Sequence, residues 1–373
     1  MVTSYSWHSG ASAVNPIWPL SKPLLADELL TSWIVRMALA HGCSPAVLTA
    51  IAWPGFRAWA SDLDRSVADS RLAVLSRLSS IPCASLQSAT IRCAMSSIVR
   101  RPDRLPRGNW PWLTVLGCRG GYHSGGLQCC PDCIAQYNSR YCIQWRLAWH
   151  TCCPIHGVML VDRCGHCLAP LQPELLKAGA MLSDCHRCGA ALSGGARSAA
   201  AEAALAFQSY VDESIGLRPL YGTSSLDFRD WLTIARTMVS FAQAAMRRHS
   251  AAVGRFFDSL DIPLESLQPI PLGLPFEYLS PAERSVLLSI VWVIMSAGPQ
   301  TFIEAARRES LPASTLHFSS NCAPPVLLDL AAALRSPGHH LVSGVGREHP
   351  SSPAQTLRMW LRLKRKVRRR GIR

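Results

Sequence analysis

Apolar side chains recur at helical spacing along most of this chain, beginning near its N-terminus. There they fall at the i, i+3, i+4 and i+7 positions of one helix face: Leu30, Trp33, Ile34 and Met37. Pro23 precedes the stripe, Asp27 is placed to cap the helix, and Gly42 follows its end. We therefore expect an amphipathic helix between Asp27 and Gly42, with Glu28 near the positive end of its dipole.

The same periodicity predicts further helices on both sides of a cysteine-rich segment. They cover roughly residues 44–51, 67–79, 86–99, 199–210, 227–249, 281–296 and 300–308. Ser44 can cap the first of them, and Pro45 suits its first turn. Strand signals are sparse and confined to the cysteine turns, so the pattern predicts a mainly α fold.

One pair of these elements could form a helix-turn-helix. It would consist of the helix at 300–308, a turn at 309–312 and a second helix at 313–318. The second helix would be short and carries no arginine or lysine, so ordinary helical packing is the alternative interpretation.

Between Cys129 and Gly189, cysteine and histidine residues form four pairs with two residues between the members of each. The pairs are Cys130 and Cys133, Cys153 and His156, Cys164 and Cys167, and Cys185 and Cys188. This spacing lets a tight turn aim both donor atoms at one ion about 2.3 Å away, and two such turns complete a tetrahedron. About 19 residues separate the turns of the first quartet and about 17 those of the second, near the usual range of roughly 15–20. The spacing predicts two structural zinc ions.

Neighbouring cysteines leave the ligand choice open at two points. Cys129 adjoins Cys130, and Cys152 adjoins Cys153, so either ligand could shift by one position. We favour Cys130 and Cys153 because they keep the two-residue turn, which Pro131 and Pro154 stiffen. Buried free cysteines would not recur in pairs at one fixed interval. Disulfides need an oxidising compartment, and the first residues show no secretory signal pattern.

These quartets do not have the features of an active site. A catalytic zinc keeps an open position and usually has three protein ligands, whereas both quartets are complete. The sequence contains no H-E-x-x-H, no base-deaminase zinc motif and no phosphate-binding loop of the G-x-x-x-x-G-K-[ST] type. A thioredoxin-like redox site would need one isolated pair in a βαβ unit. We therefore expect a protein that is not an enzyme.

The pattern and the quartets together predict three domains. A helical N-terminal region covers residues 1–125, tandem zinc fingers cover 126–193, and a helical C-terminal domain with a basic tail covers 199–373. A flexible junction at 193–198, SGGARS, separates the last two. The longest apolar run, 286–297, is too short to cross a bilayer and predicts a buried helix, so we expect a soluble cytoplasmic protein with no membrane partner.

A formal net charge of +14 points to an anionic partner, most often nucleic acid. Two zinc ions on seven thiolates would lower it only to about +11. The densest basic stretch is the C-terminal tail, with candidate nucleic-acid contacts at Arg362, Lys364, Arg365, Lys366, Arg368, Arg369 and Arg370. Apolar residues such as Leu357 and Trp360 interleave the tail, so it is either a helix end that presents arginines to phosphate or a solvated tail. A second basic stretch, Arg100 to Arg107, is either a contact or a linker.

Aromatic and basic residues near the quartets have interpretations of their own. Trp145 and Trp149 are expected to pack in the core rather than stack on bases. Some of the nearby arginines are expected to neutralise thiolates rather than contact DNA. These arginines are Arg140, Arg146, Arg163 and Arg187.

Three stretches together resemble the TniQ/TnsD family of transposition target-selection proteins. They are WPLSKPLLADELLTSWIVRMALAHG near the N-terminus, the run from CCPDC through WRLAW and CCPIHG to LVDRCGHCLAPL, and DCHRCGAAL. The resemblance covers about residues 16–192. It implies that the first quartet holds one zinc ion and the second quartet the other.

The resemblance also implies a role in DNA recombination. Members of the family choose the insertion site and recruit an AAA+ ATPase that engages the transposase. Some bind target DNA directly, and others act as dimers on an RNA-guided CRISPR effector complex, so a homodimer is possible here. A zinc-containing transcription regulator that binds DNA without an ATPase is the alternative, and the N-terminal signature is what distinguishes the two.

Overall fold

The structure is a computed structural model that describes residues 17–100, 109–119, 123–125, 127–136, 139–247, 250–264, 274–318, 323–334 and 360. The chain divides into two compact units, Met1–Leu334 and Arg335–Arg373. Helices dominate the described part of the first unit, which confirms the predicted mainly α class. In the second unit the described residue is Trp360, whose side chain is exposed.

The N-terminal region is a set of short helices around its own apolar core. They are α1 (Leu30–Ala40), α2 (Pro45–Ala52), η1 (Ala58–Ala60), α3 (Leu63–Ser66), α4 (Asp69–Ser79), α5 (Cys83–Ser88) and α6 (Ile91–Ile98). The predicted stripe of α1 is fully buried in this core, together with residues of α2, α4 and α5. Ser44 caps α2 and Pro45 opens it, as predicted. The helix predicted over 86–99 is divided between α5 and α6, because the chain leaves the helical path at Thr90.

The start of α1 differs from its prediction. Asp27 is not its cap, because the helix begins at Leu30 and Asp27 has a left-handed backbone with φ of 56°. The residues before the helix pair instead with the first cysteine module: Ile143 N–H donates to Asp27 O at 2.7 Å, and Leu29 N–H to Tyr141 O at 2.9 Å. Glu28 is buried at this junction and binds Arg36 across one side of α1. Tertiary pairing therefore sets where the helix begins.

The middle of the chain contains short elements joined by turns. They are β1 (Gly117–Arg119), β2 (His123–Gly125), α7 (Pro131–Ile134), η3 (Ile143–Arg146), β3 (Cys152–Cys153), β4 (Val158–Met159), η4 (Pro173–Leu175) and η5 (Leu192–Gly194). β1 and β2 form one antiparallel hairpin, with Cys118 opposite Ser124, and β3 and β4 form another, with Cys153 opposite Val158.

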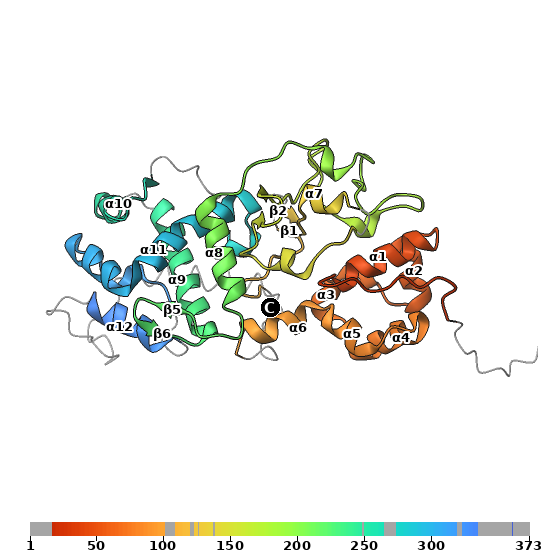
Figure 1. Cartoon of the computed structure of the whole chain (residues 1–373), viewed down its shortest axis with the longest axis horizontal. Coiled ribbons are helices and arrows are strands. Elements are labelled where there is room, and N and C mark those ends of the chain that lie inside the picture. Colours follow the sequence, from red (N-terminus) through yellow and green to blue (C-terminus); the bar gives the residue numbers. More distant parts are fainter. Residues whose placement is uncertain are drawn as a thin grey trace, which may run out of the picture. The chain divides into compact units, whose positions relative to one another are not determined.

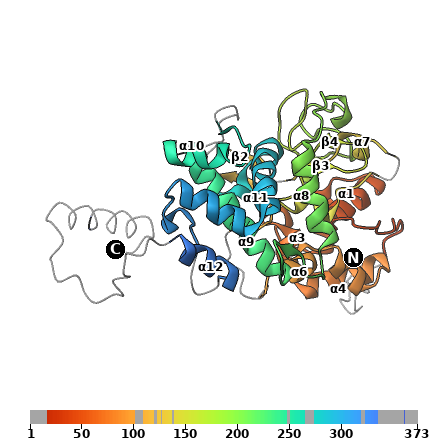
Figure 2. The same ribbon diagram turned by 60° about the vertical axis from the view of Figure 1, so that its left-hand side comes forward.

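The C-terminal half packs longer helices against one another (Figures 1 and 2). Its elements are α8 (Glu202–Glu213), the β5 (Leu220–Tyr221) and β6 (Ser224–Ser225) hairpin, α9 (Phe228–Arg247), α10 (Ala251–Asp258), η7 (Phe276–Tyr278), α11 (Pro281–Arg308), η8 (Ala313–Thr315) and α12 (Pro325–Ala333). α11 packs against both α8 and α9. One apolar core runs from the metal-binding modules through these helices.

α11 contains the long apolar run and is bent. A capping box of Ser280 and Glu283 opens it, and Gly298, with φ of 82°, interrupts it before Pro299. Gly222 in the β5–β6 turn packs on this bend, where an added Cβ would lie 2.7 Å from the Pro299 ring. By length and composition α11 is long and apolar enough to cross a membrane. The helices α1 and α2 reach that length only together, and they are bent by 101° relative to each other. Because Leu287, Val291 and Ile294 are buried against the other helices, α11 is a core helix of this fold.

Two expectations about the C-terminal half are wrong. The second helix of the proposed helix-turn-helix does not form, because only Ala313–Thr315 make a 3-10 turn and the chain then extends at Leu316. The 193–198 segment is not a free junction. Arg197 forms an ion pair with Asp132 at 2.6 Å, and Met159 N–H donates to Ser198 O at 2.8 Å.

Candidate metal centres

The first quartet comes together as a four-atom cluster. The donor atoms of Cys130, Cys133, Cys153 and His156 all lie within 4.8 Å of one another. His156 Nδ1 lies 3.3–3.5 Å from the three sulfurs, and Cys133 Sγ lies 3.7 Å from Cys153 Sγ. A tetrahedral zinc with bonds of about 2.3 Å to sulfur and 2.0–2.1 Å to nitrogen requires edges of about 3.8 Å and 3.5 Å. The cluster therefore has the size and donor set of a closed tetrahedral site.

Two local structures present these donors. Cys130 caps α7, its sulfur accepting from Cys133 N–H, with Pro131 in the first turn. Cys153 ends strand β3, and the turn to β4 returns His156 toward the same point. This turn needs the left-handed backbone of Gly157, with φ of 62°.

The cysteines next to the first quartet have a different role. Cys129 pairs with Val161 through both backbone hydrogen bonds at 2.9 Å, and Cys152 pairs with Met159 in the hairpin. Both side chains are buried and neither belongs to the cluster. The geometry therefore agrees with the preference for Cys130 and Cys153.

The second quartet forms a similar cluster. The sulfurs of Cys164, Cys167, Cys185 and Cys188 lie within 4.8 Å of one another. Cys164 Sγ is 3.8 Å from Cys188 Sγ, and Cys167 Sγ is 3.6 Å from Cys185 Sγ, near the edge of a tetrahedral four-sulfur site. Two equivalent turns build it: Leu168 N–H donates to Cys164 O, and Gly189 N–H donates to Cys185 O.

Burial makes the first cluster unfavourable as a set of bare thiolates. Burial raises the pKa of Cys133 to about 11, with further repulsion from Cys153, while Arg140 partly opposes the rise. A divalent cation supplies the positive charge that several buried thiolates need. Of the arginines expected to neutralise thiolates, Arg140 lowers the pKa of Cys133, while its Nε donates to Ala26 O at 2.8 Å. Arg146 does not, because it is fully buried and pairs with Asp62 at 2.6 Å.

Side chains from the C-terminal helices hold the first module from behind. Gln208 of α8 accepts from Thr151 N–H and donates to Cys152 O at 3.1 Å. Asp212 of α8 accepts from Trp149 Nε1–H at 2.9 Å and contacts His150 Nε2 at 3.0 Å.

Arg284 of α11 is the central residue of this support. Its guanidinium is fully buried and donates to Ala148 O, to Gln128 Oε1 and to Leu279 O. Gln128 in turn donates to His150 O at 2.6 Å. Sequence reasoning missed this residue, whose only signal was its place next to Glu283 just before the apolar run of α11.

The tryptophans of this region are core residues, as predicted. Trp145 and Trp149 are both buried, and Trp149 packs edge-on against Trp112. They do not share a helix face, because η3 ends at Arg146 and Trp149 follows in a turn.

The predicted nucleic-acid contacts in the tail lie outside the described residues. They are Arg362, Lys364, Arg365, Lys366, Arg368, Arg369 and Arg370. Most of the basic stretch after Val99 also lies outside them. Arg100 is described and is paired with Asp230 at 2.8 Å, so it does not offer a free charge.

Comparison with protein families identifies the N-terminal part of the chain. The family model TniQ matches residues 19–160. The match begins in the segment before α1 and ends directly after strand β4, so it includes the first metal cluster and stops before the second. No curated protein matches the chain. The match confirms the resemblance carried by the N-terminal signature and the first cysteine quartet.

Proposed function

Since residues 19–160 are a TniQ domain and mark a transposition-associated target-selection protein, we propose that this chain is a non-catalytic adaptor. It selects the insertion site and recruits an AAA+ ATPase that engages the transposase. It acts in the cytoplasm, either on target DNA directly or on an RNA-guided CRISPR effector complex. The family match to an unbroken segment ending in the first metal cluster is the observation that carries this proposal.

The two metal clusters support a scaffolding role. We propose that Cys130, Cys133, Cys153 and His156 hold one structural zinc ion and that Cys164, Cys167, Cys185 and Cys188 hold the other. Both sets use all four positions of a tetrahedron, which leaves none for a substrate or water. The bound ions would fix the turns between the N-terminal and C-terminal helices and so keep their surfaces in place.

A reconstituted transposition assay tests the function. A transposase and an AAA+ ATPase of a transposon that uses a TniQ protein are combined with a donor element and a mixture of target DNAs, with and without the purified chain. We expect insertions to concentrate at one site only when the chain is present. Insertion that is equally frequent and equally placed without the chain would contradict the proposal.

The same material separates the two routes of targeting. RNA that copurifies with the chain and CRISPR subunits indicates the RNA-guided route. Direct DNA binding predicts that deleting residues 358–373 weakens binding and flattens its dependence on salt, because each lost phosphate contact reduces the slope by about 0.9. An unchanged slope would show that the tail is only solvated.

A further inference from the structure

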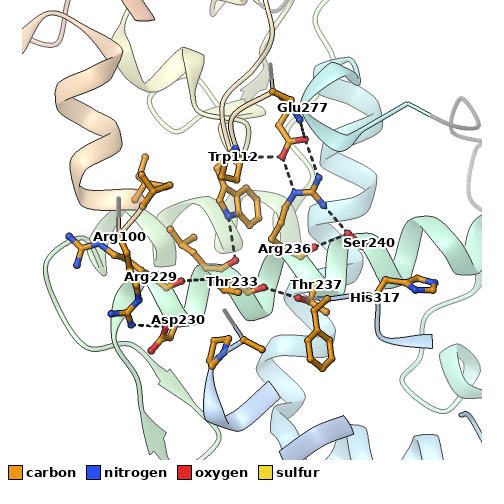
Figure 3. A pocket seen from close by; sticks show the side chains of 18 of the residues that line it. Arg100, Trp112, Arg229, Asp230, Thr233, Arg236, Thr237, Ser240, Glu277 and His317 are labelled. Carbon is orange, nitrogen blue, oxygen red and sulfur yellow. Dashed lines mark hydrogen bonds and ion pairs between the residues drawn. The ribbon is translucent and has the colours of Figure 1, made fainter. Parts of the chain in front are cut away.

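A cavity of about 1150 Å³ lies between the TniQ domain and the C-terminal helices. The end of α6, residues 109–112, one face of α9 and the start of α12 form its walls (Figure 3). Pockets for small ligands are usually about 300–1,000 Å³, so this one is large for a metabolite. It is separate from both metal clusters, which contribute no residue to its lining.

Three arginines and two acidic residues line the cavity, and a third acidic residue, Asp227, lies beside Arg100. Arg236 binds Glu277 through two hydrogen bonds of 2.8 and 3.0 Å, and Arg100 binds Asp230 at 2.8 Å with Asp227 at 3.6 Å. Figure 3 shows the Arg236 side chain between Glu277 and Ser240. The third arginine, Arg229, donates to Ser96 O. Nucleic acid binds where cations are in excess, and with Asp227 counted the three arginines meet three carboxylates, which favours a ligand without net charge.

Two buried polar atoms of the lining have no hydrogen-bond partner within the described part of the chain. One is an acceptor, Asn109 Oδ1, and the other is a donor, Arg229 Nε. Buried polar groups are nearly always paired in native proteins. A ligand that carries both a donor and an acceptor would satisfy these two atoms.

Hydroxyl groups along α9 add further acceptors. Thr233 and Thr237 donate to carbonyls one turn earlier in the helix, and so does Ser240. Their hydrogens are used, which leaves oxygen lone pairs on Thr233 and Thr237 for a donor from outside, whereas Ser240 Oγ already accepts from Arg236 at 3.0 Å. The apolar part of the cavity lining comes from Ile98, Pro111, Trp112, Leu232, Phe318, Pro324 and Pro325.

We propose that this cavity receives an extended, overall uncharged segment of a partner protein. A peptide backbone repeats a donor and an acceptor at every residue, which suits Asn109, Arg229 and the hydroxyl line, while apolar side chains would lie on the prolines and Phe318. The inference deepens the proposed function and rests on it, because the partner is then a protein of the transposition machinery. It also assigns this face to protein contact rather than to DNA or RNA.

Peptide selection on the purified full-length chain with zinc bound tests the proposal. Random peptides of about 12 residues are selected from a display library, and the dissociation constants of labelled peptides are measured by fluorescence anisotropy. Thr233→Trp narrows the cavity from an exposed position of α9 and should weaken binding about tenfold or more. Arg229→Lys keeps the charge but removes the Nε donor and should weaken binding about threefold to tenfold. Arg247→Trp places the same aromatic ring at an exposed position of α9 outside the cavity and should leave binding unchanged.

Several outcomes overturn the proposal. They are the failure to select any peptide, equal binding by Thr233→Trp and wild type, and displacement of the peptide by single-stranded oligothymidylate of about 12 nucleotides. If Thr233→Trp melts below wild type, Arg229→Lys decides the result. The transposition assay is independent of this one. Peptide binding without any effect of the chain on insertion keeps the cavity proposal and contradicts the function, whereas the reverse result contradicts only the cavity.

Discussion

The two metal clusters have the same architecture but different surroundings. Side chains of α8 and α11, among them Gln208, Asp212 and Arg284, hold the first module, and Cys130 and Cys153 are buried in the main core. Cys164 and Cys185 of the second cluster are buried in the same core, but its hydrogen bonds lie mainly within its own turns, and Cys188 is exposed. The comparison indicates that side-chain hydrogen bonds from the C-terminal helices fasten the first centre to the fold, whereas the second is joined to the same core mainly by apolar packing.

Removing a ligand of the first centre should have the largest effect. We expect Cys153→Ser to reduce bound zinc from two ions to one and to lower the melting temperature of the whole chain by roughly 10 °C or more, because the loss reaches the shared core. Metal analysis and calorimetry measure both quantities. Cys93→Ser changes an exposed cysteine outside both clusters and serves as the matched control, with no expected change.

Removing the Arg284 hydrogen bonds to the first module should give the next largest loss of stability. Arg284→Met should destabilise the chain by about 3 kcal/mol, because Gln128 Oε1 and the Ala148 carbonyl lose a charged donor in a buried place. Denaturant unfolding measures the change. Arg255→Met breaks an exposed pair with Glu309 and should cost no more than about 1 kcal/mol. Equal losses in the two variants would show that Arg284 is not a special link.

Loss of the second centre should leave the rest of the chain folded. Cys185→Ser should also reduce bound zinc to one ion, yet lower the main melting temperature by only a few degrees, about 1–2 kcal/mol. Hydrogen exchange should show lost protection over residues 164–192 and retained protection over 127–161. A collapse of both regions would end the distinction between the two centres.

The smallest effect concerns a carboxyl group in η4, which lies between the two turns of the second centre in sequence and contacts α1 and α2. Burial raises the pKa of Glu174 in η4 to about 7. In the folded chain the group therefore keeps its proton to a higher pH than in the unfolded chain, so its ionisation destabilises the fold as pH rises from about 4.5 to 7. Glu174→Gln should stabilise the chain relative to wild type, by about 1–2 kcal/mol more at pH 8 than at pH 5.5. Paired melting curves at the two pH values measure this, and a constant difference would contradict the buried site.

Sequence patterns predicted much of the fold and the donor atoms of both centres. The stripe of α1, the cap of α2 and the break before Pro299 follow from local chemistry, because each depends on residues within a few positions of one another. The four pairs of donors could also be predicted from the sequence, since a turn with two intervening residues brings two donors together without help from the rest of the chain. The predicted division at 125 and 199 stays a prediction.

Other features depended on contacts between distant segments. Asp27 is a residue type that often caps helices, yet its carbonyl accepts a hydrogen bond from Ile143 N–H, and α1 begins only at Leu30. Arg146 lies between the halves of the first quartet in sequence but pairs with Asp62. The short helix predicted at 313–318 is only a turn, because a local pattern of so few residues does not overcome the cost of starting a helix.

The sequence by itself therefore determined the helical class, the two cysteine and histidine quartets that come together, and the family signature, all of which arise from spacing along a continuous stretch of chain. Only the tertiary structure decided that the first centre is joined to α8 and α11, that Arg284 is its buried support, and that a charge-balanced cavity lies beside the TniQ domain. The contacts that join the first centre to α8 and α11 pair residues 56 to 156 positions apart. Such pairs depend on how whole helices pack, and no local spacing encodes that packing.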